Sequence, residues 1–145
     1  MRHSTLRAIA TVRTFAHWQR RPGLLAKAAR KVIRLRHMWW SWVSGTDIAL
    51  GARIGERLDL PHANGVVIHQ DAVVGDDCMI MQQVTLGQLS RRGAPILEEG
   101  VYVGAGAKVL GSIRIGARAQ IGANAVVLKD VPAGATAVGI PARIV

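Results

Sequence analysis

Two histidines in the stretch LPHANGVVIHQD, residues 60–71, carry side chains suited to proton transfer. His62 and His69 lie seven residues apart, in a segment whose Asn-Gly pair and aliphatic residues are typical of tight turn and strand. Because an imidazole titrates near neutral pH, either histidine could serve as a general base or as a metal ligand. The elements that position the two histidines must decide between these roles.

An aliphatic residue recurs at every sixth position from residue 48 onward. Such a period corresponds to one short strand plus one turn, and three units of this kind close a triangular coil. The repeat therefore predicts a mainly β solenoid of about four coils with an aliphatic interior. Its inward positions are Ile48, Ile54, Leu60, Ile68, Val74, Ile80, Leu86, Leu97, Val103, Val109, Ile115, Ile121 and Val127.

Small residues accompany this repeat. Glycine often follows the aliphatic residue, where we expect it to permit turn dihedral angles that a side chain would penalise. A small or aliphatic residue occupies the fourth position after it, and Cys78 falls in one of these inward places. We expect Cys78 to be a small core residue, and as the single cysteine it excludes an intramolecular disulfide.

The repeat is interrupted twice. Leu60 and Ile68 are eight residues apart, so two extra residues must bulge out within PHANGV, which contains His62. Leu86 and Leu97 are eleven residues apart, so a loop leaves the coil between them. Because functional residues concentrate on loops of rigid scaffolds, these interruptions are the candidate site.

The charge divides the chain into two parts. Residues 1–46 hold ten of the 19 Lys and Arg residues and no acid, whereas residues 47–145 hold nine basic and nine acidic residues. We interpret 1–46 as a basic amphipathic helical segment and 47–145 as the β domain. The chain has neither a run of apolar residues long enough to span a membrane nor a recognisable secretory signal, so we expect a cytoplasmic protein.

Two helices are expected in the basic segment, one before Arg21 and one over residues 24–43. The first has an expected apolar stripe of Leu6, Ile9, Val12 or Arg13, and Ala16. The second has a stripe formed by Leu25, Ala28, Val32, Leu35, Trp39 and Trp42, with Gly45 as its C-cap. This stripe either packs on the rest of the protein or a neighbouring chain, or contacts an anionic membrane surface peripherally. No spacing typical of a nucleic-acid-binding motif is present.

The segments DIALGARIG, PHANGVVI, VTLG and VYVGAGAKVLGSIRIGARAQIGANAVVLKDVPAGATAVGIPARIV resemble the catalytic domain of serine acetyltransferases. That family belongs to the hexapeptide-repeat acyltransferases, whose domain is a left-handed parallel β-helix. The resemblance covers residues 47–145. It implies transfer of an acetyl group from acetyl-CoA, as co-substrate, to a hydroxyl group, with no permanently bound cofactor or metal.

The resemblance also implies roles for particular residues. His62 matches the family's catalytic base and Asp47 the carboxylate that orients it. A base at this place would deprotonate the hydroxyl as it attacks the thioester, and a carboxylate on the far ring nitrogen would stabilise the imidazolium. Gly87, Gln88, Ala105 and Ala123 match CoA-binding positions, with Lys108 and Arg118 as candidate phosphate partners. Because the family's sites lie between subunits of a trimer, we expect a homotrimer.

The sequence departs from the family mainly on the acceptor side. The family's Arg-His-Pro loop, which supplies a second histidine and the arginine that contacts the serine carboxylate, is Gly93-Ala94-Pro95 here, with Arg91 or Arg92 as candidate substitutes. Pro61 stands where the family has an aspartate. The family's large N-terminal helical domain is replaced by residues 1–46, and the chain stops without the family's C-terminal tail.

Serine and a saccharide hydroxyl therefore both remain open as acceptors. A metal-dependent enzyme with the same repeat would need three histidines, and the β domain has only His62 and His69. A non-catalytic β-helix scaffold is the third hypothesis, favoured by the missing second histidine. We expect His69 to be a surface or rim residue that points outward from a coil corner.

Overall fold

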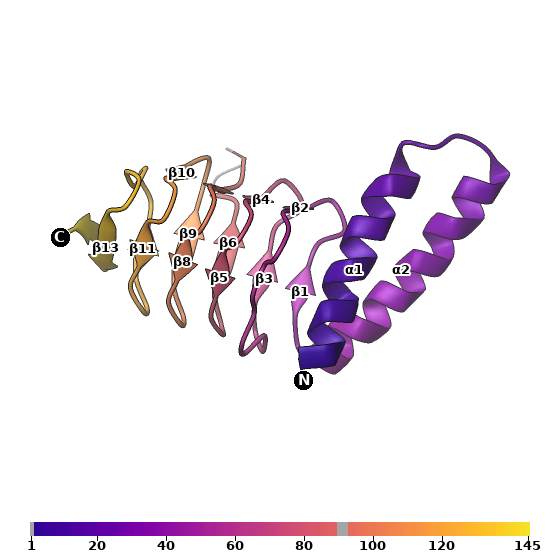
Figure 1. Cartoon of the computed structure of the whole chain (residues 1–145), viewed down its shortest axis with the longest axis horizontal. Helices are drawn as coiled ribbons and strands as arrows, with labels where there is room; N and C mark the ends of the chain where they lie inside the picture. Colours follow the sequence, from indigo (N-terminus) through magenta and orange to yellow (C-terminus); the bar gives the residue numbers. More distant parts are fainter. Residues whose placement is uncertain (1, 90–92) are drawn as a thin grey trace.

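The computed structural model of the chain describes residues 2–89 and 93–145. Two antiparallel helices at one end are followed by a column of short strands that ends at the C-terminus (Figure 1). The predicted mainly β solenoid with a helical N-terminal segment is therefore confirmed.

The helical hairpin consists of α1 (Arg2–Gln19) and α2 (Leu24–Ser44). Its break falls at Pro22-Gly23, between the helices expected before Arg21 and over residues 24–43. Gly45 ends α2 in the left-handed conformation (φ 68°), and the next amide, that of Thr46, donates to the Ser41 carbonyl oxygen at 3.1 Å. A residue without Cβ adopts this φ without steric cost, so the glycine sets the place where the helix stops.

The strands form three parallel sheets around one interior, apart from an antiparallel last pair. Sheet A has the order β1-β3-β6-β9-β12, sheet B the order β10-β7-β4-β2, and sheet C the order β14-β13-β11-β8-β5. Four turns of the solenoid separate β1 from β12. The strands are β1 (Asp47–Ile48), β2 (Arg53–Ile54), β3 (Val67–Ile68), β4 (Val73–Val74), β5 (Met79–Ile80), β6 (Thr85–Gly87), β7 (Ile96–Leu97), β8 (Tyr102–Val103), β9 (Lys108–Leu110), β10 (Arg114–Ile115), β11 (Gln120–Ile121), β12 (Val126–Val127), β13 (Thr136–Gly139) and β14 (Ala142–Ile144).

The register of sheet A confirms both interruptions. Ile68 pairs with Leu86, and their separation is that of three regular repeats, which make one coil. The pair of Ile48 with Ile68 is two positions wider than this regular coil, and the pair of Leu86 with Val109 is five positions wider. The extra residues therefore leave the coil at the places where the sequence repeat breaks.

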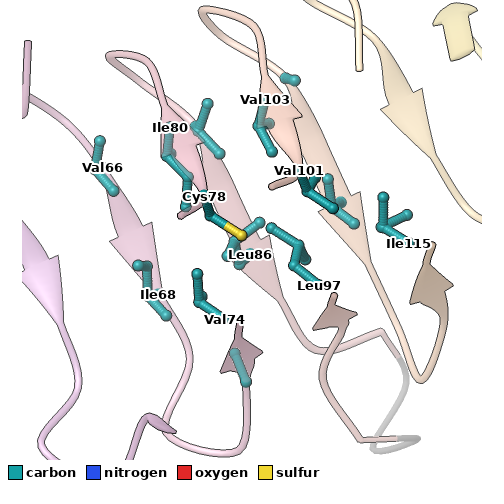
Figure 2. Packing of buried hydrophobic residues seen from close by; sticks show 14 of the residues in the cluster. Val66, Ile68, Val74, Cys78, Ile80, Leu86, Leu97, Val101, Val103 and Ile115 are labelled. Atoms are coloured by element: carbon teal, nitrogen blue, oxygen red, sulfur yellow. The ribbon is translucent and has the colours of Figure 1, made fainter. Parts of the chain in front are cut away.

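The interior is built from the predicted aliphatic positions, all of which are buried except Ile54, which is partly buried. Figure 2 shows side chains from different strands, among them Ile68, Leu86 and Leu97, directed into one interior. Cys78 lies among them with no exposed surface, as predicted, and burial raises the pKa of its thiol. Truncating a fully buried leucine such as Leu86 to alanine would cost about 2–5 kcal/mol.

The expected role of the repeat glycines is wrong in one respect. At Gly104 a Cβ would lie 2.6 Å from the Ala123 amide nitrogen of the next coil, so glycine is required there because two coils approach closely. The left-handed dihedral angle falls two residues later, at Gly106 (φ 74°). At the equivalent positions of other corners, Arg118 and Asn124 adopt the same left-handed conformation (φ 57° at both).

The predicted stripe of α1 is also partly wrong, and that of α2 is exposed to solvent. In α1, Ile9 and Val12 pack into the core of the β-helix, but Leu6 and Ala16 are exposed. In α2 the residues of the predicted stripe are all exposed, which leaves a neighbouring chain or a membrane surface as the expected contact. The buried residues of α2 are instead Ala26, Ile33, His37 and Ser44. Both helices bury a face that contains polar side chains with hydrogen-bond partners, which hydrophobic periodicity does not detect.

His37 joins both helices to the β-helix. Its Nδ1 lies 2.7 Å from Thr11 Oγ1 of α1, and its Nε2 lies 2.7 Å from the Ile48 carbonyl oxygen of β1. Since a carbonyl oxygen only accepts, Nε2 carries a proton and donates. Burial, which disfavours the charged imidazolium, lowers the pKa of His37 below its ordinary value of 6.5.

The stability of the protein should therefore fall as the pH drops below 6.5. In that range the unfolded chain binds a proton at His37 that the folded chain resists, so protonation favours unfolding. Thermal unfolding followed by circular dichroism should give a lower Tm at a pH about one unit below this value than about one unit above it. His37→Gln should reduce the difference, and His3→Gln, at an exposed position on α1, should leave it unchanged. An equal difference in the His37 variant would contradict this role.

Candidate active site

His62 lies in the turn made by the first interruption. The turn connects sheet C to sheet A, and the amide of Gly65 donates to the Gly45 carbonyl oxygen at 2.7 Å. Its backbone thus rests on the end of α2. The imidazole of His62 is exposed to solvent. A fixed backbone and an open side chain suit a base that receives a diffusing substrate.

Asp47 opens the first strand of sheet A. It pairs with Val67, its amide donates to the Val66 carbonyl oxygen at 2.8 Å, and its side chain points outward. Among the described residues, no hydrogen bond or ion pair joins Asp47 to His62. The orienting role of Asp47 stays a prediction.

A shallow hollow of about 250 Å³ lies on sheet A beside Asp47. Three strands contribute to it, and the lining includes His69 and Gly87 but not His62. The residues of the hollow are Asp47, Ala49, Val67, Ile68, His69, Gln70, Leu86 and Gly87. The structure therefore brings Asp47 together with the histidine that we expected to be a rim residue.

His69 is half-buried and is held by its neighbours. Its Nδ1 accepts a hydrogen bond from the Asp71 amide at 3.2 Å and lies 3.7 Å from the Asp71 carboxylate. The position of His69 beside Asp47 follows from the regular coil length and the two inserted residues. They put Val67 beside Asp47 on the adjacent strand, and His69 follows Val67 by two positions on the same side of the sheet.

Ala105 and Ala123 share one edge of sheet A with the turn of His62. The Gln83 amide donates to the Asn64 carbonyl oxygen at 3.0 Å. In later coils the Gly106 amide donates to Gln82, and the Asn124 amide to Ala105, at 2.9 and 2.8 Å. These bonds stack the turns into a single ridge, which we call the C–A corner (residues 61–65, 81–84, 104–107 and 122–125). Small side chains at Ala105 and Ala123 leave the later coils of this ridge uncrowded.

The other predicted CoA residues lie elsewhere on the same face. Gly87 ends β6 at the opposite edge of sheet A, and Gln88 follows it. Gly65 at one edge and His69 at the other are four positions apart along the chain, so the two edges are about 13 Å apart. Lys108 lies between the edges, where its ammonium group donates to the Gln83 carbonyl oxygen at 2.7 Å and to Thr85 Oγ1 at 3.2 Å.

The remaining predicted site residues are arginines, and the structure brings none of them to sheet A within the described residues. Arg118 lies at a different corner, where its guanidinium pairs with Glu99 at 3.4 Å, so the structure does not bring it to sheet A. Arg91 and Arg92 lie outside the described residues. The described end of that loop, Gly93 to Pro95, carries no charged side chain.

Metal-ligating groups do not converge in this region. Within residues 2–89 and 93–145, no three His, Cys, Asp or Glu side chains lie together in a way that could hold a metal ion. His62 and His69 lie near opposite edges of sheet A. The arrangement places an exposed imidazole, a carboxylate and an open ridge along sheet A, and acyl transfer to a hydroxyl uses groups of these kinds.

Comparison with known proteins agrees with the repeat and the fold. Residues 94–129 match the family model for bacterial transferase hexapeptide (six repeats). The serine acetyltransferase of Synechococcus elongatus is 44% identical over 135 residues, 90% of this chain and 52% of that protein. That of Mycobacterium tuberculosis is 47% identical over 131 residues, 88% of this chain and 54% of that protein. The chain thus spans about half the length of the curated relatives that it matches.

Solved structures extend the comparison. A serine acetyltransferase in complex with CoA superposes with a TM-score of 0.83 at 39% identity, over 98% of this chain and 57% of that one. Soybean serine acetyltransferase complexed with serine gives 0.83 at 39% identity, over 95% of this chain and 56% of that one. The repeat match, the sequence identity and the shared fold together show that the chain carries the hexapeptide repeat and the β-helix of serine acetyltransferases, to which it is similar.

Proposed function

We propose that the chain is an O-acetyltransferase that moves an acetyl group from acetyl-CoA to a hydroxyl acceptor. The observation that carries the proposal is similarity over nearly the whole chain to serine acetyltransferases, including structures described as bound to CoA and to serine. The C–A corner adds a physical argument, because it joins the His62 turn to the two small residues Ala105 and Ala123 in one continuous ridge.

In the proposed reaction His62 acts as the general base. It takes the proton of the acceptor hydroxyl as the oxygen attacks the thioester carbonyl carbon, and the C–S bond then breaks. The proton passes from the imidazolium to the departing CoA sulfur, so that the base is regenerated. Asp47 would stabilise the imidazolium electrostatically from sheet A.

CoA would lie along the C–A corner, with its pantetheine arm beside Ala105 and Ala123. Gly87 and Gln88 would flank the thioester, and Lys108 would supply a cation after release of its contacts with Gln83 and Thr85. Because these residues occupy both edges of sheet A, we propose that the site forms between neighbouring copies of the β-helix in a homotrimer. Use of acetyl-CoA would place the reaction in the cytoplasm.

The acceptor is either serine or a saccharide hydroxyl. A serine carboxylate held away from water requires a cationic partner, and Gly93 and Ala94 replace the residues that the resemblance leads us to expect there. This substitution favours a saccharide, whose hydroxyl groups need hydrogen-bond partners but no counter-charge. His69 and Gln70 could supply such partners in the hollow beside Asp47.

A thiol-release assay with acetyl-CoA tests the reaction class. We expect CoA thiol to appear when the protein is given serine or one member of a panel of sugars, above the rate measured without acceptor. The buried Cys78 should add little background. The absence of release with every acceptor would instead support a non-catalytic β-helix scaffold.

Variants at the two histidines test the assignment of the base. His62→Ala should lower kcat by about 10²–10⁴-fold, the usual contribution of a general base. His69→Ala should mainly raise the KM for the acceptor, because His69 lines the hollow without lying on the C–A corner. If kcat fell only in the His69 variant, the reaction would instead take place in the hollow beside Asp47 and His69.

A further inference from the structure

One face of α2 carries large apolar side chains that are exposed to solvent. We call it the outer face, and its residues range from 42% to 84% exposed. Trp39 and Trp42 lie on it with ring centroids 5.9 Å apart. Figure 1 shows α2 on the far side of α1 from the β-helix. The outer face consists of Leu24, Leu25, Val32, Leu35, Met38, Trp39, Trp42 and Val43.

The exposure of this face does not result from an incomplete hairpin. The opposite side of α2 already packs against α1, with Ala26 and Ile33 buried and His37 bonded to Thr11. The guanidinium of Arg7 also lies 4.9 Å from the centre of the Trp40 ring, which ties that tryptophan to α1. A contiguous apolar surface of this kind on an otherwise packed element marks an interaction site.

The charges around the outer face restrict what can cover it. Lys27, Lys31, Arg34 and Arg36 are exposed on α2, and residues 1–46 contain no acidic residue. Two copies that met through this face would therefore bring like charges together. The partner must combine an apolar surface with negative charge.

The β-helix of another copy does not offer that combination readily. Several of its carboxylates are already paired with arginines of the same domain, as in Arg57–Asp77 at 2.6 Å and Arg114–Glu98 at 2.9 Å. An anionic lipid surface does offer it, because acyl chains accept the apolar face while headgroups neutralise the flanking cations. Tryptophan is also the side chain enriched at the boundary between headgroups and acyl chains.

The helix would lie in the plane of the surface. None of the helices within the described residues has the length and apolarity to cross a membrane. We therefore propose that α2 docks the protein on an anionic membrane, with its outer face in the headgroup region and its basic residues on phosphates. This contact is independent of the proposed acetyl-transfer site on the β-helix.

Vesicle flotation of the full chain tests the proposal. The protein should float with vesicles that contain phosphatidylglycerol, and much less with phosphatidylcholine alone. Binding should weaken as salt is raised, because exposed charges are screened. In the double variant Trp39→Ala with Trp42→Ala, affinity should fall by at least about tenfold through lost apolar burial. Ile140→Ala should bind normally, since Ile140 is 74% exposed but lies at the other end of the molecule.

Two results would overturn the proposal. One is absence of flotation with anionic vesicles at low salt. The other is a drop in molecular mass of the tryptophan variant, measured by light scattering without lipid, which would show that a second copy covers the outer face. If the tryptophan variant fails to fold, as judged by circular dichroism, the pair Lys27→Glu with Lys31→Glu decides. This double variant keeps the apolar face and should lose binding to anionic vesicles. Retained binding would contradict the proposal that α2 docks on an anionic membrane.

Discussion

Backbone hydrogen bonding between successive coils is the constraint on which the rest of the structure depends. Each strand, of two to four residues, is too short to be stable alone, and it persists because its amide and carbonyl groups pair with neighbouring coils. The same pairing fixes which residue lies above which, as with Ile68 above Leu86. Any residue in excess of a regular coil must then leave the column, so an insertion becomes a surface feature without disturbing the core.

The candidate site follows from that constraint. The ladder of amides at the C–A corner aligns the His62 turn with Ala105 and Ala123, although two coils of chain separate the histidine from the first alanine. The outward positions of sheet A are aligned in the same way, which places Asp47 near His69. The proposed base, the ridge proposed for CoA and the hollow beside Asp47 thus lie along sheet A. The helices close the first coil by inserting Ile9 and Val12 into its open end.

Much of this could be predicted because the repeat in the sequence is the repeat of the structure. The inward aliphatic residues, both interruptions and the limits of the two helices all follow from local spacing. That the α2 stripe faces away from α1 and the β-helix could not be predicted, because the packing of that helix is decided by the polar contacts of His37 with Thr11 and Ile48. The hollow at His69 was missed because it joins adjacent coils, and the role of Gly104 because it depends on the distance between them.

The central claim is that the C–A corner holds CoA, and calorimetric titration with CoA tests it most directly. The unmodified chain should bind CoA saturably, and Ala123→Glu should weaken binding by at least about tenfold, since it places a longer, negative side chain on the ridge beside a negatively charged ligand. Ala133→Glu, which is also exposed but lies at another corner, should bind CoA like the unmodified chain. Absence of binding by the unmodified chain, or equal binding by the Ala123 variant, would contradict the account.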